Sequence, residues 1–261
     1  MTTTRAVRRL LLTGLVVLLG LALPAAAGAY QAPGPIHAGN TYGWYRNHLT
    51  RYEFIGAKPQ AFKVHGRGVV RDQHGMLTLN TTRHGSVSAT LDKRGHAYGR
   101  WEIRLRSRRF ATNHTNFRVV TDLIPAGDRK QHCGARDIGL ENYRFGRHWA
   151  NFYIHTLPHR SFRAFQGRNL SNDRWHTFAV EVTPHHISWF VDAHVVRTER
   201  RDAALSGVPL TVRFKMKALR GHTMNPSRMQ MDWLRYWSDE YPSQKSIAAP
   251  RPHQATYAKA C

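Results

Sequence analysis

Apolar and polar side chains alternate one by one through several stretches of this sequence. Residues 100–106, 176–182 and 210–217 each place an apolar side chain at every second position, with polar or charged side chains between. This spacing puts the apolar groups on one face of a β-strand. Turn-forming pairs such as Asn172-Asp173 and Asn225-Pro226 separate the stretches, and no long stretch has helical periodicity. The pattern predicts an all-β fold, an antiparallel sandwich or barrel with one sheet face buried and the other free.

The two ends of the chain differ from its centre. Residues 1–29 carry three Arg, then an apolar run at 10–23, then a cluster of small residues, which is typical of a cleavable secretory signal peptide. The apolar run is shorter than the roughly 20 residues that span a membrane, and no second run of that length follows. We expect a leader at residues 30–40 and an extended, Pro-containing C-terminal tail at residues 241–261. One domain at residues 41–240 remains, in a protein that we predict to be secreted and monomeric.

The charge of the chain predicts its kind of partner. The sequence has 39 Lys plus Arg against 16 Asp plus Glu, a formal net charge of +23. Removing the three Arg of the signal peptide leaves 36 against 16, or +20. With 41% hydrophobic residues, the chain is too apolar for a disordered polycation. Such a charge attracts nucleic acid, anionic membranes or acidic polysaccharide, and export favours the polysaccharide over nucleic acid.

Cys133 and Cys261 are the two cysteines of the chain. Two cysteines cannot build a disulfide framework, and no Cys/His spacing is typical of a zinc finger. Export permits a disulfide between Cys133 and Cys261, which would tie down the C-terminus. Two unpaired thiols are the alternative.

Four segments of the chain share motifs with a known enzyme family. Tyr98–Arg106 is close to the pattern YGRxExRIR, and Arg174–Asp192 is similar to WHTYAVEWTP followed by ISWYVDG. His74–Leu79 and Met229–Trp237 match a short early strand and the closing strand. In this order the segments resemble glycoside hydrolase family 16, the laminarinase- and lichenase-like enzymes. The resemblance covers about residues 65–237 and implies a concanavalin A-like β-sandwich (jelly roll) whose concave carbohydrate cleft acts on O-glycosyl bonds of β-linked polysaccharide.

The family carries its catalytic carboxyl groups on one strand, as E-x-D-x-E or, with a bulge, as E-x-D-x-x-E. A retaining glycosidase holds its nucleophile and its acid/base about 5–5.5 Å apart. In the matching segment without a bulge, Asp137, Gly139 and Glu141 occupy the three positions. With a bulge, Ala135, Asp137 and Leu140 occupy them, and both catalytic Glu are lost.

We prefer the register without a bulge, because it places Asp137, Glu141 and Tyr143 on one face and Ile138 and Leu140 on the other. The resemblance then makes Glu141 the acid/base and Asp137 the nucleophile or base. Asp is one methylene shorter than Glu, and a wider gap would suit inversion, which needs about 6.5–9.5 Å. The alternative is that the two carboxylates only form salt bridges on a basic sheet. The protein would then be a catalytically decayed, lectin-like binder of acidic polysaccharide.

Four side chains are candidates for substrate binding: Tyr143, His155, Arg136 and Trp175. Tyr143 belongs to a group of four aromatics that would replace the family's sugar-stacking Trp, although several of them must be core: Tyr143, Trp149, Phe152 and Tyr153. Trp175 would also stack on sugar, with packing within the fold as an equal alternative. His155 would contact a sugar hydroxyl or relay a proton, with a surface histidine as the alternative. Arg136 would bind sulfate, phosphate or carboxylate groups through its guanidinium fork.

Asp232 is the one candidate metal ligand. The resemblance implies that this position helps to hold a structural calcium on the convex side, where backbone carbonyls supply most of the other ligands. We expect no other cofactor.

Overall fold

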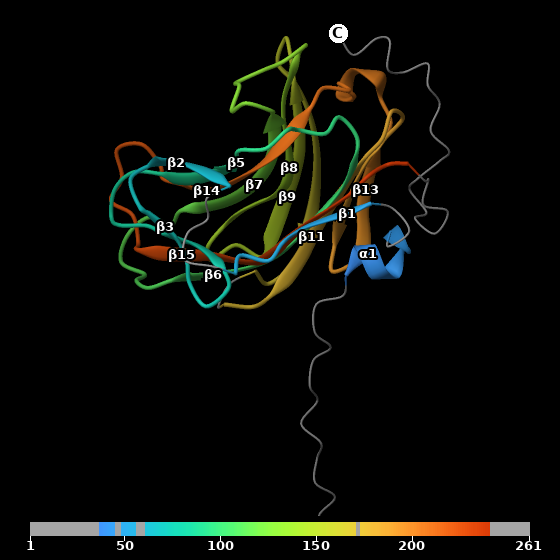
Figure 1. Ribbon diagram of the computed structural model, residues 1–261. Helices are drawn as coiled ribbons and strands as arrows, with labels where there is room; N and C mark the ends of the chain where they lie inside the picture. The colour runs from blue at the N-terminus through green and yellow to red at the C-terminus, as the bar shows by residue number, and fades with distance from the viewer. Residues whose placement is uncertain (1–36, 45–47, 56–60, 171–172, 241–261) are drawn as a thin grey trace, which may run out of the picture. The chain divides into compact units, whose positions relative to one another are not determined.

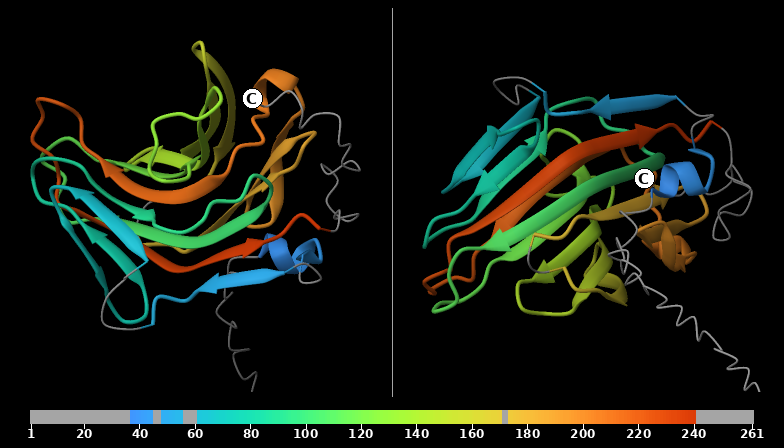
Figure 2. Two further views of the ribbon diagram at one scale, coloured as in Figure 1. Left: turned by 45° about the horizontal axis from the view of Figure 1, so that its top comes forward. Right: turned by 90° about the horizontal axis from the view of Figure 1, so that it is seen from below.

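The computed structural model describes residues 37–44, 48–55, 61–170 and 173–240, all within one compact unit of residues 34–261. Its strands form two antiparallel sheets that face each other (Figure 1, Figure 2). The all-β sandwich expected from the alternating pattern is confirmed. Within the described ranges, no helix has the length and apolar character needed to cross a membrane.

The seven-stranded sheet has the strand order β10-β9-β8-β7-β14-β5-β2. Its central strands come from different parts of the chain, because β14 lies between β7 and β5. The strand bounds are β2 Phe62–Gly66, β5 Val87–Leu91, β7 Arg118–Pro125, β8 Ala135–Arg144, β9 Trp149–Thr156, β10 Arg160–Gly167 and β14 Leu210–Lys217.

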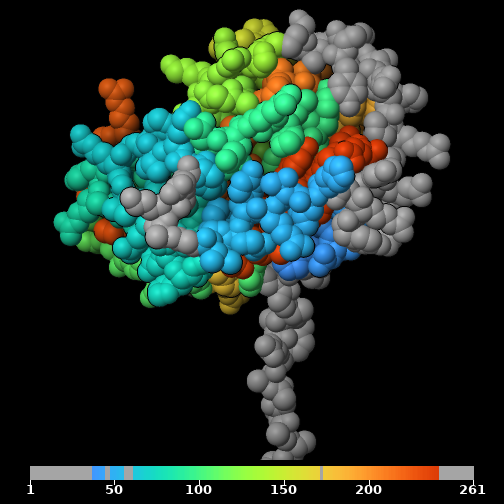
Figure 3. All heavy atoms as spheres, in the orientation of Figure 1, coloured from blue at the N-terminus to red at the C-terminus, as the bar shows by residue number. Residues whose placement is uncertain are grey.

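The eight-stranded sheet has the order β13-β12-β11-β6-β15-β4-β3, and β1 pairs with the end of β15. The space-filling view of Figure 3 shows β1 on the surface of the molecule beside β15. The bounds are β1 Leu49–Tyr52, β3 Val69–Asp72, β4 Leu77–Asn80, β6 Gly99–Arg109, β11 His176–Val182, β12 Ile187–Val191, β13 His194–Glu199 and β15 Ser227–Trp237. A short 3-10 helix, Asp202–Ala204, precedes β14.

The hydrophobic core lies between the inner faces of the two sheets. Ile103 and Leu105 of β6 belong to it, as do Phe214 and Met216 of β14, and none of them is more than 1% exposed. The period-two alternation of these strands therefore predicted their inner faces correctly. Burying one such side chain contributes roughly 1.5–3 kcal/mol to folding.

A second apolar cluster covers the outer face of the eight-stranded sheet. The short helix α1, Ala38–Thr41, and the fully buried Trp44 pack there. The Trp44 ring lies 5.4 Å from the rings of both Phe190 and Trp237. The last residues of the expected leader are thus part of the folded unit, and the expected domain start at residue 41 falls inside α1. Residues 30–36 and the expected tail at 241–261 lie outside the described residues.

A β-bulge in β8 changes which of its side chains face outward. Gly139 pairs with Asp122 of β7, and Glu141 pairs with Thr121, so β8 contains one extra residue between them. The ladder to β9 is displaced over the same stretch. Because side chains alternate with a period of two, one extra residue moves every later side chain to the opposite face.

Candidate active site

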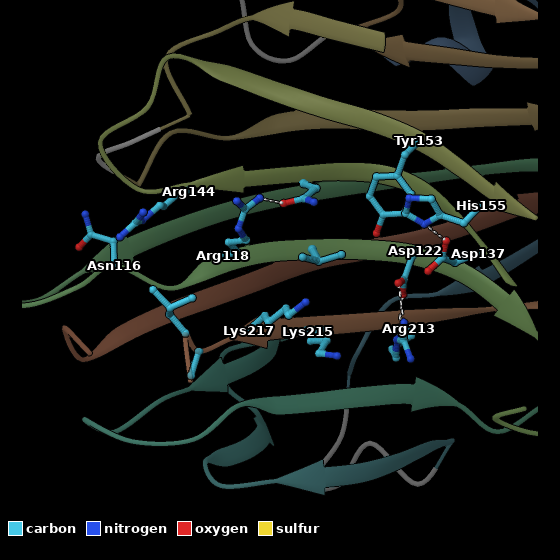
Figure 4. Close-up of a pocket in the computed structure, with 14 residues that line it drawn as sticks. Asn116, Arg118, Asp122, Asp137, Arg144, Tyr153, His155, Arg213, Lys215 and Lys217 are labelled. Atoms are coloured by element: carbon cyan, nitrogen blue, oxygen red, sulfur yellow. Dashed lines mark hydrogen bonds and ion pairs between the residues drawn. The ribbon is translucent and has the colours of Figure 1, made fainter. Parts of the chain in front are cut away.

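A cleft of about 500 Å³ opens on the outer face of the seven-stranded sheet (Figure 4). Side chains from β7, β8, β9 and β14 form most of its floor and walls. The lining residues are Asn116, Arg118, Val120, Asp122, Asp137, Asn142, Arg144, Tyr153, His155, Arg213, Lys215, Lys217, Ala218 and Leu219.

The strand register arranges the floor in rows that cross the sheet. In the first row, Tyr153 pairs with Gly139, Gly139 with Asp122, and Asp122 with Arg213. Outward-facing residues in such paired positions have their Cβ atoms about 4.5–5.5 Å apart. The side chains of one row therefore form one continuous stripe across the cleft.

The next two rows become progressively more basic. Asn142 and Lys215 belong to the second row, on either side of Val120. In the third row, Arg118 pairs with both Arg144 and Lys217, so three cations lie next to one another. The Arg118 guanidinium also donates a long hydrogen bond of 3.4 Å to Asn142 Oδ1.

Asp137 and His155 form a close pair at the other end of the cleft. His155 Nδ1 lies 2.5 Å from Asp137 Oδ1, and the side chains of His155 and Asp137 are 34% and 23% exposed, respectively. The imidazole also stacks on the Tyr153 ring, with centroids 4.6 Å apart and planes inclined by 24°. The pair fixes Nδ1 toward the carboxylate, which leaves Nε2 as the nitrogen available to a ligand.

Tyr153 occupies the space above Gly139. A Cβ atom at position 139 would lie only 2.4 Å from Tyr153 Cε1 and 2.6 Å from Cζ. Burial raises the pKa of the Tyr153 hydroxyl well above its usual value of 10.0, and the nearby charge of Asp122 adds to this shift. The hydroxyl therefore stays protonated and can donate a hydrogen bond.

Asp122 is held by a forked ion pair with Arg213. Arg213 Nε and Nη2 donate to the two carboxylate oxygens at 2.9 and 2.6 Å. Burial raises the pKa of Asp122, and the hydrogen bonds from Arg213 counteract part of that shift. Burial, together with the neighbouring Arg213 charge, lowers the pKa of Lys215. The cationic side chains of Arg213 and Lys215 therefore lie close together at this point of the cleft.

Glu141 does not face the cleft, and the register preferred from the sequence is wrong. Its side chain is fully buried, and neither carboxylate oxygen has a hydrogen-bond partner among the described residues. Burial raises the pKa of Glu141 well above 4.5, and the nearby charge of Asp122 adds to this shift. The bulge between Gly139 and Glu141 accounts for the error, because it turns Glu141 inward. Glu141 therefore cannot contact a sugar in this structure.

Asp137 and Gly139 face outward before the bulge, and the bulge directs Asn142 and Arg144 outward after it. The first three of these positions correspond to the family pattern. Their spacing equals E-x-D-x-x-E, the bulged form of the family pattern, but lies two residues later than the bulged register expected from the sequence. Only the first position keeps a carboxyl group. Gly replaces the central acid, and an amide replaces the outer one.

Tyr143 is also buried rather than exposed to substrate. Its side chain packs in the core, and its hydroxyl forms a 2.5 Å hydrogen bond with Ser107 of β6. Burial raises its pKa, so the phenol stays neutral. The expected role of Tyr143 as a sugar platform is therefore wrong, and the bulge that displaces Glu141 also explains this.

The remaining candidates lie outside the cleft. Trp175 is held against Arg104 and Arg106 of β6, with cation–π distances of 4.7 and 4.5 Å, which favours the packing alternative. Arg136 is exposed on β8 but does not line the cleft. Asp232 is bound by Arg104 at 2.5 Å, so a cation already occupies the carboxylate expected for calcium. The residues present do not fit that metal.

Cys133 lies in the turn before β8. Cys133 is disulfide-bonded, and its expected partner, Cys261, is outside the described residues. Among the described residues, no group of three or more His, Cys, Asp or Glu side chains could hold a metal ion.

Several cleft residues were not predicted from the sequence. Asp122, Asn142, Arg213 and Lys215 line the cleft but were not singled out. The sequence did contain a signal for Arg213 and Lys215, since both are polar positions of the alternating stretch at 210–217. Only the order of strands in the sheet shows that this polar face lies beside β7 and β8.

The fold is that of the concanavalin A-like glucanases. An endo-1,3-β-glucanase (laminarinase) catalytic domain from Thermotoga petrophila aligns with a TM-score of 0.60 at 12% identity, over 75% of this chain and 100% of that one. The laminarinase from Rhodothermus marinus aligns with a TM-score of 0.58 at 15% identity, over 73% and 98%. The endo-β-1,3-glucanase from Pyrococcus furiosus aligns with a TM-score of 0.60 at 11% identity, over 72% and 93%.

The model of the glycosyl hydrolases family 16 matches residues 57–235 of the sequence. The chain therefore belongs to glycoside hydrolase family 16, as its motifs indicated. A search of curated protein sequences gives no match.

Proposed function

We propose that this protein acts on O-glycosyl bonds of an anionic, β-linked polysaccharide held in the cleft. The observation that carries the proposal is the charge of the cleft lining. Among the described residues, five cationic side chains line it, Arg118, Arg144, Arg213, Lys215 and Lys217, against two carboxylates. Both carboxylates are already paired inside the protein. The free positive charge would attract carboxylate or sulfate groups along a polymer.

Family membership supports the β-linked part of the proposal. The similar structures are described as β-glucanases and laminarinases, and one of them holds laminari-oligosaccharides. This chain keeps their sandwich and places a cleft on one sheet face. It differs from the family pattern in the carboxyl groups of β8.

Binding without cleavage is a second candidate function. The observation that favours it is the loss of two of the three acidic positions, since Gly139 and Asn142 cannot act as general acids or bases. Hydrolysis by the usual course needs two carboxyl groups on the same site. The cleft offers Asp137 and the buried, Arg-bound Asp122.

We also place the protein outside the cell, because residues 1–29 have the composition of a secretory signal. The N-terminal sequence of the protein recovered from the culture medium tests this. A start near residues 28–30 is the expected result, and a start at Met1 would contradict export through a cleaved signal.

The experiment for the cleft measures binding and bond cleavage together. The full-length protein is tested with neutral β-glucan, sulfated galactan and a β-linked uronate polymer, over a range of salt concentrations. The variant Arg118→Gln/Arg144→Gln removes two charges of the third row, and Arg108→Gln removes an exposed charge of β6 on the other sheet. We expect the double variant to bind anionic polymer at least tenfold more weakly and with a weaker salt dependence. Equal binding by the double variant and the control would contradict the proposed cleft.

A further inference from the structure

The cleft combines three features that hydrolysis does not use. The His155 imidazole is oriented by Asp137, the Tyr153 hydroxyl projects from the neighbouring position of the same strand face, and Lys215 lies in the adjoining row. Figure 4 shows the Tyr153 and His155 side chains side by side next to Asp137, while Lys215 comes from β14, three strands away in the same sheet. At the same time, the position of the second catalytic carboxyl belongs to Asn142. This set lacks what a glycosidase needs, but it contains a base, an acid and a cation.

We propose that the cleft breaks the glycosidic bond by β-elimination in a polysaccharide of 4-linked uronate residues, with His155 as the base and Tyr153 as the acid. The inference rests on the proposed function, since the polymer must first bind in the cleft. The substrate class is a polyuronate. In the proposed reaction, removal of a proton next to a carboxylate takes the place of attack by water.

The step balances without water or a co-reactant. His155 Nε2 takes the proton from C5, the carbon that bears the carboxylate. The electron pair of that bond forms the C4=C5 double bond, and the bond from C4 to the glycosidic oxygen breaks. Tyr153 Oη gives its proton to the departing oxygen. Solvent then returns the proton from His155 to the phenolate of Tyr153, and the cleft is ready for another residue of the polymer.

The position of His155 suits removal of a proton. The Asp137 carboxylate binds Nδ1 at 2.5 Å, which fixes the tautomer with Nε2 free to accept a proton. The same carboxylate stabilises the imidazolium that forms. Stacking on Tyr153 holds the plane of the ring, so the acid and the base keep a constant relative position.

Lys215 and Asn142 provide a place for the substrate carboxylate. Negative charge spreads onto that carboxylate as the C5 proton leaves, and a fixed cation or amide donor lowers the energy of this state. Lys215 is available for this role, because Arg213 binds Asp122 and His155 binds Asp137. Asn142 shares its row, with only the aliphatic Val120 between them.

Gly139 and Tyr153 together explain why the central acid of the family pattern is missing. The Tyr153 ring fills the volume in which the central acid of the family pattern would lie, since Cε1 is 2.4 Å from the point that a Cβ atom would occupy at position 139. A proton donor has thus taken the place of a carboxylate. Elimination at a uronate uses such a proton donor, whereas hydrolysis loses the carboxylate that supports its nucleophile.

The test distinguishes the two kinds of cleavage by their products. Elimination leaves a C4=C5 double bond conjugated with the carboxylate, which absorbs ultraviolet light, and one new reducing end per bond. Hydrolysis leaves a reducing end alone. The full-length protein is incubated with poly-β-mannuronate, with a β-linked polyglucuronate and with sulfated galactan, which has no carboxylate. We expect absorbance and reducing ends to rise together on at least one polyuronate, and neither to rise on the galactan.

Three variants complete the experiment. His155→Gln and Tyr153→Phe should each lower the rate of double-bond formation by roughly 10²-fold or more, with polymer binding within about threefold of the parent. Arg108→Gln removes an exposed charge of β6 on the other sheet and should keep the parent rate. Reducing ends without absorbance, or bound polyuronate without new ends, would overturn the elimination while leaving binding intact. A protein that binds no anionic polymer would overturn the proposed function as well.

Discussion

The ring of Tyr153 lies directly against the backbone of Gly139, on the neighbouring strand of the same sheet. This contact leaves no room for a side chain at the centre of the family's catalytic pattern. It also holds the phenol beside His155. In this chain the central acid of the family pattern is therefore not simply lost, because the ring of Tyr153 packs in its place.

Gly139→Ala should destabilise the protein by about 1–3 kcal/mol, because the new methyl group would overlap the Tyr153 ring. Chemical unfolding of the purified variant measures this. Gly167→Ala on β10 is the matched control, since its nearest neighbour is 3.8 Å away. Adding Tyr153→Ala should relieve the overlap, so the two changes should be non-additive. Additive effects would show that the ring moves aside freely.

Glu141→Gln should leave cleavage and binding unchanged. Burial keeps the Glu141 carboxyl in its neutral form, and an amide of the same shape replaces it inside the sandwich. The free energy of unfolding near neutral pH should change by about 1 kcal/mol or less. Activity assays beside unfolding curves check both statements. Loss of cleavage in a folded Glu141→Gln protein would restore Glu141 as the acid/base.

Glu102 should make the protein less stable as the pH rises from about 4.5 to about 7. The carboxyl is buried beneath α1 and accepts hydrogen bonds from the N–H groups of Ala38 and Gly39 at 2.5 and 3.2 Å. Burial raises its pKa from 4.5 to about 7. The group therefore stabilises the folded state fully below pH 4.5, and this contribution is lost as the pH rises through 7.

The loss attributable to Glu102 is on the order of 3 kcal/mol. Unfolding by urea at about pH 5 and about pH 7.5 measures it, and Glu102→Gln supplies the comparison because an amide does not titrate. The variant should show a smaller difference between the two pH values than the parent. An equal difference would mean that Glu102 ionises in the folded protein as readily as in the unfolded chain.

Trp44→Ala should lower the free energy of unfolding by about 3–5 kcal/mol, since the ring is fully buried against Phe190 and Trp237. Polymer binding should survive in the folded fraction, because this cluster covers the other sheet. Trp149→Ala serves as the control, as its ring is 44% exposed. Similar losses for the two variants would contradict the packing of residues 37–44 on the eight-stranded sheet.

Much of the fold follows from local patterns in the sequence. The alternation in the stretches that became β6, β11 and β14 predicted strands with the correct inner faces, because each strand keeps its period throughout its core positions. Four motifs in order predicted the family, and the family model confirms it. His155 and Asp137 were both expected in the cleft, and both line it.

The sequence determined the alternating strands, the family and the excess of positive charge, since each depends on residues near one another or on a simple sum. Only the tertiary structure decided which acid faces the cleft. The sequence pattern hardly reveals a one-residue bulge in a strand that has polar and apolar residues on both faces. The bulge nevertheless turned Glu141 and Tyr143 into the core. The pairing of strands distant in sequence then placed Tyr153, Arg213 and Lys215 around Asp137, which no local pattern could reveal.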